Sequence, residues 1–183
     1  MEEKLYEEKI SSKKIFKGEI LSLYFDKVKL PNGKTATREK VEHPGAVAVV
    51  PINKKRQVIL IKQYRYPVEK DLIEIPAGKL DRSEPPLECA KRELKEEAGI
   101  SGKNFDLLAT IYTSPGFSNE LMYIYLVTDF LEEENNPDHD EFLQILKIDL
   151  NECIKMIEEG AICDAKSIIG ILMAKDHLSK NTR

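Results

Sequence analysis

The stretch at residues 78–100, GKLDRSEPPLECAKRELKEEAGI, carries the most informative pattern in the chain. On a helix with 100° per residue, an apolar stripe suited to packing against a core is formed by Leu87, Ala90, Leu94 and Ala98. Beside this stripe, Glu93 is a helical neighbour of both Glu96 and Glu97. Such like-charge pairs are unfavourable, so the three carboxylates are expected to share a bound cation. Mg²⁺ or Mn²⁺ suits carboxylate and phosphate oxygens.

The spacing of the fixed residues resembles the Nudix box, G-x5-E-x7-R-E-U-x-E-E-x-G-U, in which U is a bulky aliphatic residue. Every fixed position is filled, by Gly78, Glu84, Arg92, Glu93, Leu94, Glu96, Glu97, Gly99 and Ile100. The alternative is a solvated helix with charge pairs such as Glu88 with Arg92. The two framing glycines and the flanking segments favour the box.

The resemblance implies metal-dependent hydrolysis of a nucleoside diphosphate linked to another group, with Mg²⁺ as the expected ion and Mn²⁺ as the alternative. It assigns the metal to Glu93, Glu97, Glu96 and the carbonyl of Ala77. For Glu96, a hydrogen-bonding role is the alternative. Arg92 is expected to orient a glutamate of the box, with Glu84 in support, and an ordinary helical ion pair is the alternative.

Two flanking regions resemble ADP-ribose pyrophosphatases: QYRYP at residues 63–67 with LIEIPAGKL at residues 72–80, and SPGFSNE at residues 114–120. The resemblance implies cleavage of ADP-ribose to AMP and ribose 5-phosphate. The residues expected to bind substrate are Arg65, Arg38, Phe117 and Glu120. Arg65 is either a bidentate phosphate ligand or an exposed arginine at a strand end. Phe117 either stacks on adenine or packs in the core.

The box does not identify the base that activates water, because its glutamates are all candidates for binding metal. The resemblance places an acidic residue ahead of the final strand in this role, and the corresponding segment here is residues 136–141. The candidates, in order of preference, are Glu141, Asp140 and Asp138, followed by Glu96 of the box. A solvated acidic turn is the alternative reading of this segment.

The pattern of extended runs divides the chain near Pro44. Residues 1–43, with a turn at residues 31–33, predict a small strand-rich unit. Residues 44–183 predict an α/β fold, the Nudix α/β/α sandwich with a mixed sheet, including paired core strands at residues 46–52 and 57–64. Isolated strands pair readily, and the subfamily that the chain resembles is typically dimeric through them, so a homodimer is expected.

Polar residues mark the expected helix boundaries. Ser83 is expected to cap the acidic helix, and Asp149 and Asp164 to cap two later helices. The terminal helix is expected to present to the core a face of Ile168, Ile169, Leu172 and Met173.

Composition narrows the class of partner and the compartment. The net charge of -4, with 33% charged residues and no basic cluster, argues against nucleic-acid binding. Neither a membrane span nor a secretory signal is expected. The odd count of 3 cysteines, without metal-type spacing, suggests reduced thiols and a cytoplasmic protein. The family resemblance implies a small nucleotide-sugar substrate. Two alternatives stay open: hydrolysis of another nucleoside diphosphate derivative, and a non-catalytic module that binds nucleotide.

Overall fold

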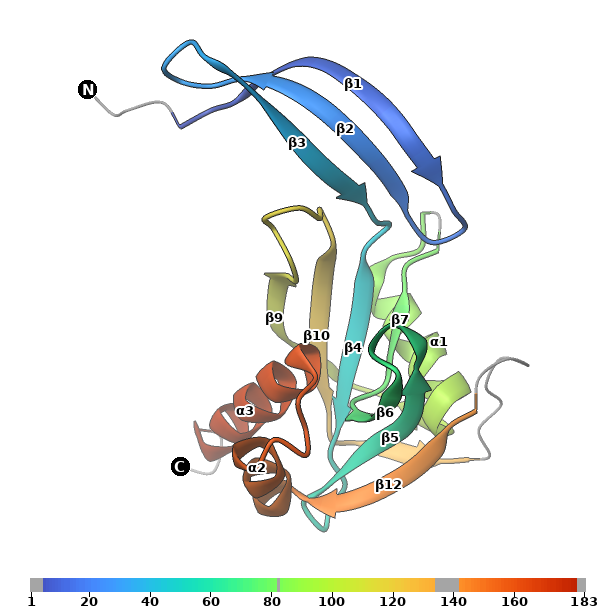
Figure 1. Ribbon diagram of the computed structural model, residues 1–183. Helices are drawn as coiled ribbons and strands as arrows, with labels where there is room; N and C mark the ends of the chain where they lie inside the picture. The colour runs from blue at the N-terminus through green and yellow to red at the C-terminus, as the bar shows by residue number, and fades with distance from the viewer. Residues whose placement is uncertain (1–4, 82, 134–141, 181–183) are drawn as a thin grey trace. The chain divides into compact units, whose positions relative to one another are not determined.

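The computed structural model describes residues 5–81, 83–133 and 142–180 (Figure 1). The chain forms two compact units. One consists of Met1–Gly45 and Tyr112–Leu121, and the other of Ala46–Ile111 and Met122–Arg183. No helix among the described residues is both long enough and apolar enough to span a lipid bilayer.

The first unit is a three-stranded antiparallel sheet in the order β1-β2-β3. Its strands are β1 (Glu8–Lys17), β2 (Ser22–Lys29) and β3 (Thr35–Glu42). Every residue of β1 is exposed, and in β2 only Asp26 and Val28 are buried. The described strands of this unit therefore bury very little apolar surface.

The loop at residues 112–121 belongs to the same unit and is hydrogen bonded to the end of β3. The Val41 amide donates to the Phe117 carbonyl at 2.7 Å, and the Asn119 amide donates to the Val41 carbonyl at 3.2 Å. The Asn119 side-chain oxygen accepts from the His43 amide at 2.8 Å. These bonds attach a distant segment of the sequence to the strand that precedes the second unit.

The second unit contains a four-stranded mixed sheet in the order β7-β4-β10-β9. Its central strand β4 pairs antiparallel with β7 and parallel with β10. The strands are β4 (Ala46–Pro51), β7 (Ala77–Lys79), β9 (Phe105–Tyr112) and β10 (Leu121–Val127). A further sheet has the order β12-β5-β6, with β5 (Gln57–Arg65), β6 (Lys70–Glu74) and β12 (Gln144–Asp149). The second unit also contains a separate two-stranded sheet of β8 (Ile100–Gly102) and β11 (Phe130–Glu132) and a short helix, η1 (Tyr66–Val68).

Strand β4 explains why helices cover both faces of the mixed sheet. Its six residues are all buried, and successive side chains of a strand point to opposite faces. Val47 and Val49 pack with α1 (Pro86–Ala98) in one core cluster. The alternate residues pack with α2 (Leu150–Glu158) and α3 (Ala165–Lys180) in the other cluster. Figure 1 shows the two layers of helix, and the predicted α/β/α sandwich is confirmed.

The expected pairing of residues 46–52 with residues 57–64 is wrong. Strand β4 belongs to the mixed sheet and β5 to the other sheet, and the two segments share only the bridge between Ile52 and Val58. The intervening turn is held by the Asn53 side chain, whose oxygen accepts from the amides of Lys55 and Gln57 at 3.0 Å each. The local turn therefore forms, but the strands separate immediately beyond it.

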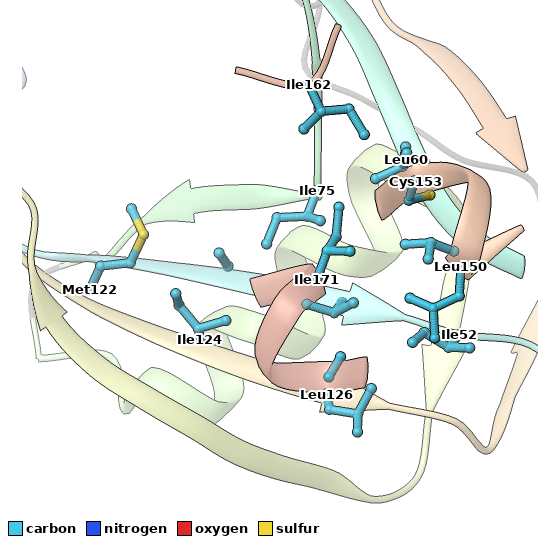
Figure 2. Packing of buried hydrophobic residues seen from close by; sticks show 14 of the residues in the cluster. Ile52, Leu60, Ile75, Met122, Ile124, Leu126, Leu150, Cys153, Ile162 and Ile171 are labelled. Atoms are coloured by element: carbon cyan, nitrogen blue, oxygen red, sulfur yellow. The ribbon is translucent and has the colours of Figure 1, made fainter. Parts of the chain in front are cut away.

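The larger core cluster lies between the sheets and the C-terminal helices (Figure 2). Its labelled side chains are Ile52, Leu60, Ile75, Met122, Ile124, Leu126, Leu150, Cys153, Ile162 and Ile171. Helix α3 approaches closely at Gly170, where an added Cβ would lie 2.8 Å from a methyl group of Val50. The absence of a side chain at this position lets the helix backbone approach the sheet.

The expected core face of α3 needs correction. The fully buried residues of the helix are Ser167, Gly170, Ile171 and Ala174. Leu172 and Met173 are 44% and 37% exposed, whereas Ile168 and Ile169 are partly buried against the core. The helix is therefore rotated relative to the face that its large apolar residues predict, because Gly170 provides the close contact.

Candidate active site

Helix α1 carries the acidic residues and has well-defined ends. It begins at Pro86 with Pro85 as N-cap, so the expected N-cap Ser83 is wrong. At the other end Gly99 has a φ of 63°, and its amide donates to the carbonyls of Leu94 and Lys95. Glycine suits this left-handed position because it has no Cβ to clash. The helix ends at Ala98, one residue after its last acidic pair.

Arg92 binds three of the carboxylates. Its Nε and Nη2 donate to the two oxygens of Glu84 at 3.0 and 2.9 Å. Its Nη1 donates to Glu93 at 2.8 Å and to Glu96 at 3.0 Å. The charged hydrogen bonds from Arg92 lower the pKa of Glu84 to about 2, and the same contact raises the pKa of Arg92. Arg92 therefore offsets the like-charge repulsion of the helix.

Arg92 forms a helical ion pair with Glu96 at i,i+4 spacing, in addition to its contacts with Glu84 and Glu93. Glu88, the partner expected for Arg92 on a solvated helix, is not bonded to it, although the structure describes both residues. Glu88 instead accepts from Lys91 at 2.8 Å on the exposed side of the helix. Cys89 also contacts Arg92, with its sulfur 3.4 Å from Nη2, and the Cys89 thiol donates to the Lys79 carbonyl at 3.3 Å. Burial raises the pKa of Cys89 to about 12, which keeps it a neutral thiol in this charged cluster.

Strand β7 contacts the acidic helix through its backbone. Glu97 is only 2% exposed and accepts from the Ala77 amide at 2.9 Å. At Gly78 an added Cβ would lie 1.9 Å from the Glu93 carboxyl carbon and 2.1 Å from one of its oxygens. Only glycine leaves room for the Glu93 carboxylate here. Gly78 is thus linked to Glu93 by direct packing, and its neighbour Ala77 is linked to Glu97 by a hydrogen bond.

Arg65, at the end of β5, is bound to a buried acid. Its Nε and Nη2 donate to the two oxygens of Glu74 at 3.0 and 2.8 Å, and Glu74 is 1% exposed. Glu74 also accepts from Lys166 at the start of α3. The Arg65 side chain keeps 39% of its surface exposed, and Glu97 adds to the electrostatic raising of its pKa. Arg65 is therefore held by the protein at the surface of the second unit.

The other residues expected to bind substrate lie in the first unit. Arg38 is exposed on β3 and forms two hydrogen bonds with Glu7. Glu120 accepts from the Thr113 hydroxyl at 2.6 Å and lies 3.7 Å from the His43 ring nitrogen. Phe117 is 57% exposed, so the alternative of core packing is wrong.

The expected bases lie outside the described part of the chain. They are Asp138, Asp140 and Glu141. The fourth candidate, Glu96, is described and accepts from Arg92.

Two charged residues were missed by the sequence reasoning. Glu74 and Lys166 are 92 positions apart and meet in the second unit. Glu74 lies inside the quoted LIEIPAGKL segment, where a lone acid among apolar residues is a signal of a buried, partnered carboxylate. Nothing in the local sequence of Lys166 points to that partner.

Comparison with known proteins assigns the family. A model of the NUDIX domain matches residues 42–167, more than half of the chain. The chain belongs to the NUDIX family. It is a Nudix hydrolase with every fixed position of the box filled.

Two relatives of this NUDIX chain are similar over nearly their whole length. It is 41% identical over 169 residues to an ADP-ribose pyrophosphatase of Bacillus subtilis strain 168, covering 91% of each chain. It is 42% identical over 171 residues to a protein of Bacillus methanolicus called a methanol dehydrogenase activator, covering 92% of each. A crystal structure described as an ADP compounds hydrolase superposes with a TM-score of 0.85 at 22% identity, covering 96% of this chain and 95% of that one. This last likeness concerns the fold.

NUDIX hydrolases generally need a divalent metal, and the donor chemistry here fits one. Carboxylate oxygens are hard ligands of the kind that such ions prefer, and the space left by Gly78 holds the Glu93 carboxylate. Among the residues that the structure describes, no three acidic, histidine or cysteine side chains already form a metal cluster. Glu93 and Glu96 accept from Arg92 instead. Arg92 therefore supplies positive charge to carboxylates that a metal would otherwise share.

Proposed function

We propose that this Nudix hydrolase cleaves the diphosphate linkage of ADP-ribose, giving AMP and ribose 5-phosphate. The observation that carries the proposal is the packing of Gly78 against Glu93, together with the Arg92 hydrogen bonds that gather the box carboxylates. The relative from Bacillus subtilis, an ADP-ribose pyrophosphatase, supports the choice of a small nucleotide-sugar substrate.

The proposed metal ligands are Glu93, Glu97, Glu96 and the Ala77 carbonyl. Mg²⁺ is the proposed ion, with Mn²⁺ as a substitute. When bound, such an ion neutralises charge on the diphosphate and lowers the pKa of a bound water. The protein's own contribution is to aim these oxygens: the Ala77 amide fixes Glu97 at 2.9 Å, and Arg92 orients Glu93 and Glu96.

The proposed substrate ligands are Arg65, Arg38, Phe117 and Glu120. Arg65 uses two of its five N–H donors on Glu74, so three remain for phosphate oxygens. The exposed ring of Phe117 suits stacking on adenine. The proposed base is Glu141, with Asp140, Asp138 and Glu96 as successors, since a carboxylate free of metal can accept the proton of the attacking water.

We also propose that residues 1–43 form a dimerisation unit ahead of the hydrolase domain at residues 44–183. The support is apolar exposure: Ile10, Ile15, Phe16 and Ile20 are each at least 50% exposed. A second copy of the chain would cover these side chains. A cytoplasmic location is part of the proposal, since all three cysteines are free.

A second candidate function is favoured by one comparison. The relative from Bacillus methanolicus is called a methanol dehydrogenase activator and is 42% identical over 92% of each chain. Activation of such a dehydrogenase is tested by measuring its rate with and without this protein. Wild-type protein and Glu97→Gln should be compared, because activation by both would indicate a binding role that needs no hydrolysis.

The proposed substrate is tested with a panel of nucleoside diphosphate derivatives and chromatographic identification of the products. The panel should contain ADP-ribose, other ADP-sugars, GDP-sugars and oxidised nucleotides. We expect the highest kcat/KM for ADP-ribose, with AMP and ribose 5-phosphate in equal amounts. Efficient cleavage of another member, without release of AMP from ADP-ribose, would contradict the substrate and leave the hydrolase assignment in place.

A further inference from the structure

A chain of polar contacts in the second unit connects Arg65 to the start of α3. Glu74 is 1% exposed and accepts from Arg65 on one side and from Lys166 on the other. Lys166 also lies 3.0 Å from Asp164. Asp164 accepts from the Ser167 hydroxyl at 2.6 Å, and that hydroxyl accepts from the Ile75 amide at 2.9 Å. The chain of contacts thus returns to Ile75, the residue that follows Glu74.

Stability alone is a weak reason to keep this arrangement. Moving a carboxylate out of water is costly, and buried ion pairs often contribute no more than apolar residues of similar volume. The two acids and two bases balance, yet they differ in exposure. The Lys166 side chain is 11% exposed, whereas the Arg65 side chain keeps 39% of its surface in solvent. Glu74 therefore holds one cation that is largely covered and one that reaches solvent.

The geometry of the Arg65–Glu74 pair leaves one edge of the guanidinium available. The pair uses Nε and Nη2, which lie along one side of the planar group. The remaining donors are both N–H groups of Nη1 and the second N–H of Nη2. They form no hydrogen bond within the described part of the chain. This free edge matches the spacing of two oxygens on a phosphate.

Arg65 also lies within electrostatic reach of the acidic helix, since Glu97 is among the groups that stabilise its charge. The segment that follows Glu74 leads directly to Ala77, whose amide binds Glu97. The carboxylate that holds the arginine and the amide that holds a candidate metal ligand are thus three residues apart on one extended segment. A fixed distance between cation and metal site is what binding of a metal-bound diphosphate requires.

We propose that Glu74 is a positioning residue, which fixes the Arg65 guanidinium so that its free edge meets a phosphate of the substrate. This inference rests on the proposed function and adds to it. Lys166 balances the second acid of the cluster, Asp164, and its contact with Glu74 ties that carboxylate to α3. Glu74 itself does not touch substrate. Its effect is to remove the conformational freedom of a long side chain before the substrate arrives.

The test is a double-mutant cycle that keeps the buried charge balanced. Glu74→Gln with Lys166→Met removes one negative and one positive charge together, and Arg65→Lys removes the bidentate group. We expect the balanced pair and Arg65→Lys each to raise KM for ADP-ribose by roughly tenfold or more. Combined, they should add less than about twofold to the larger single effect, because the variants disable the same contact.

The matched control is an exposed ion pair on the same two strands. Lys62 and Asp71 lie 3.0 Å apart, with side chains 40% and 52% exposed. The variant Lys62→Met with Asp71→Asn also removes one charge of each sign. We expect it to leave KM unchanged. Glu74→Asp serves as a second variant if the balanced pair does not fold, since it keeps the charge but shortens the side chain, and it should also raise KM.

Three results would overturn the positioning role: an unchanged KM in the folded Glu74 variants, effects that simply add to that of Arg65→Lys, or an equal rise in the control. The proposed function fails separately, if wild-type protein does not cleave ADP-ribose. The cycle is then measured with the panel member that wild-type protein cleaves. If it cleaves none, the positioning role is contradicted as well.

Discussion

Gly78 shows how a residue without a side chain can decide where a carboxylate lies. An added Cβ would overlap the Glu93 carboxyl group, at 1.9 Å from its carbon. A real side chain here must push Glu93 out of its place between β7 and Arg92. The requirement for glycine is thus steric and local. Glycine is needed here to make room for the Glu93 carboxylate and not to form a turn.

Replacing Gly78 with alanine should therefore damage catalysis more than folding. We expect kcat for ADP-ribose to fall by roughly a hundredfold, because the proposed metal ligand Glu93 is displaced. Steady-state kinetics and thermal melting measure the two effects. Gly33→Asn is the control, since Gly33 has a φ of +83° that asparagine tolerates and no atom within 4 Å of an added Cβ. Equal activity of Gly78→Ala and wild type would contradict the packing argument.

The Glu84 pair with Arg92 predicts a particular pH dependence of stability. The folded pKa of Glu84 is about 2, below the ordinary value of 4.5. Its stabilising effect is therefore complete above pH 4.5 and is lost as the pH falls toward 2. In urea unfolding, the free-energy difference between wild type and Glu84→Gln should shrink over that range. Glu88→Gln, on the exposed side of the helix, is the control, and a difference independent of pH at Glu84 would contradict the prediction.

Some residues of the site were predictable from sequence because their constraint lies within one helix. Glu93, Glu96 and Glu97 are three and four residues apart, so helical geometry alone places Glu93 next to the other two. Glu74 and Lys166 were missed because their contact joins a strand end to a helix start far along the chain. Ser83 was misjudged as N-cap because Pro85 can begin a helix without a side-chain hydrogen bond.

Helix α3 illustrates what sets the packing of a whole element. Its large apolar residues suggested one face, but Gly170 brings the helix backbone close to the sheet on another. Hydrophobic periodicity weights large residues and ignores a position where the backbone itself makes the contact. A helix that packs through glycine is therefore predicted in the right place but with the wrong rotation.

Gly170→Ala should destabilise the protein despite the better helix propensity of alanine. The new Cβ would lie 2.8 Å from Val50 and 3.0 Å from Ile75, so the helix must shift. Overpacking of this kind costs about 1–3 kcal/mol, against about 1 kcal/mol gained in propensity. Urea unfolding measures the net change. Leu172→Ala, at a position that is 44% exposed, should cost less than Gly170→Ala, and the reverse order would contradict the packing.

Buried strands were easier to predict from the sequence than exposed ones. The six residues of β4 are all buried and give a continuous apolar run. Strand β1 is exposed along its whole length and is rich in lysine and serine, so no alternation marks its start at Glu8. The false pairing of residues 46–52 with residues 57–64 came from reading a polar turn as a hairpin. The choice of sheet for each strand depends on contacts beyond that turn.

At the scale of the whole molecule, the apolar residues of the first unit predict association. Ile10, Ile15 and Phe16 on β1 are 50%, 52% and 56% exposed. We expect sedimentation velocity to give a dimer at micromolar concentration. Ile10→Lys with Ile15→Lys should give a monomer with an unchanged circular dichroism spectrum, because neither side chain is buried in the single chain. A monomeric wild type would contradict the dimer.

We propose that the carboxylates of α1 support metal-dependent cleavage of ADP-ribose. The most direct measurement is AMP release by wild type and Glu97→Gln, each with Mg²⁺ and with a chelator. Glu97→Gln keeps the size of a side chain that is 2% exposed, and circular dichroism shows whether it folds. We predict AMP and ribose 5-phosphate from wild type with Mg²⁺ alone, and a rate lower by roughly a hundredfold or more in the variant. AMP release that survives both the chelator and Glu97→Gln would show that neither a metal nor this carboxylate is needed for cleavage.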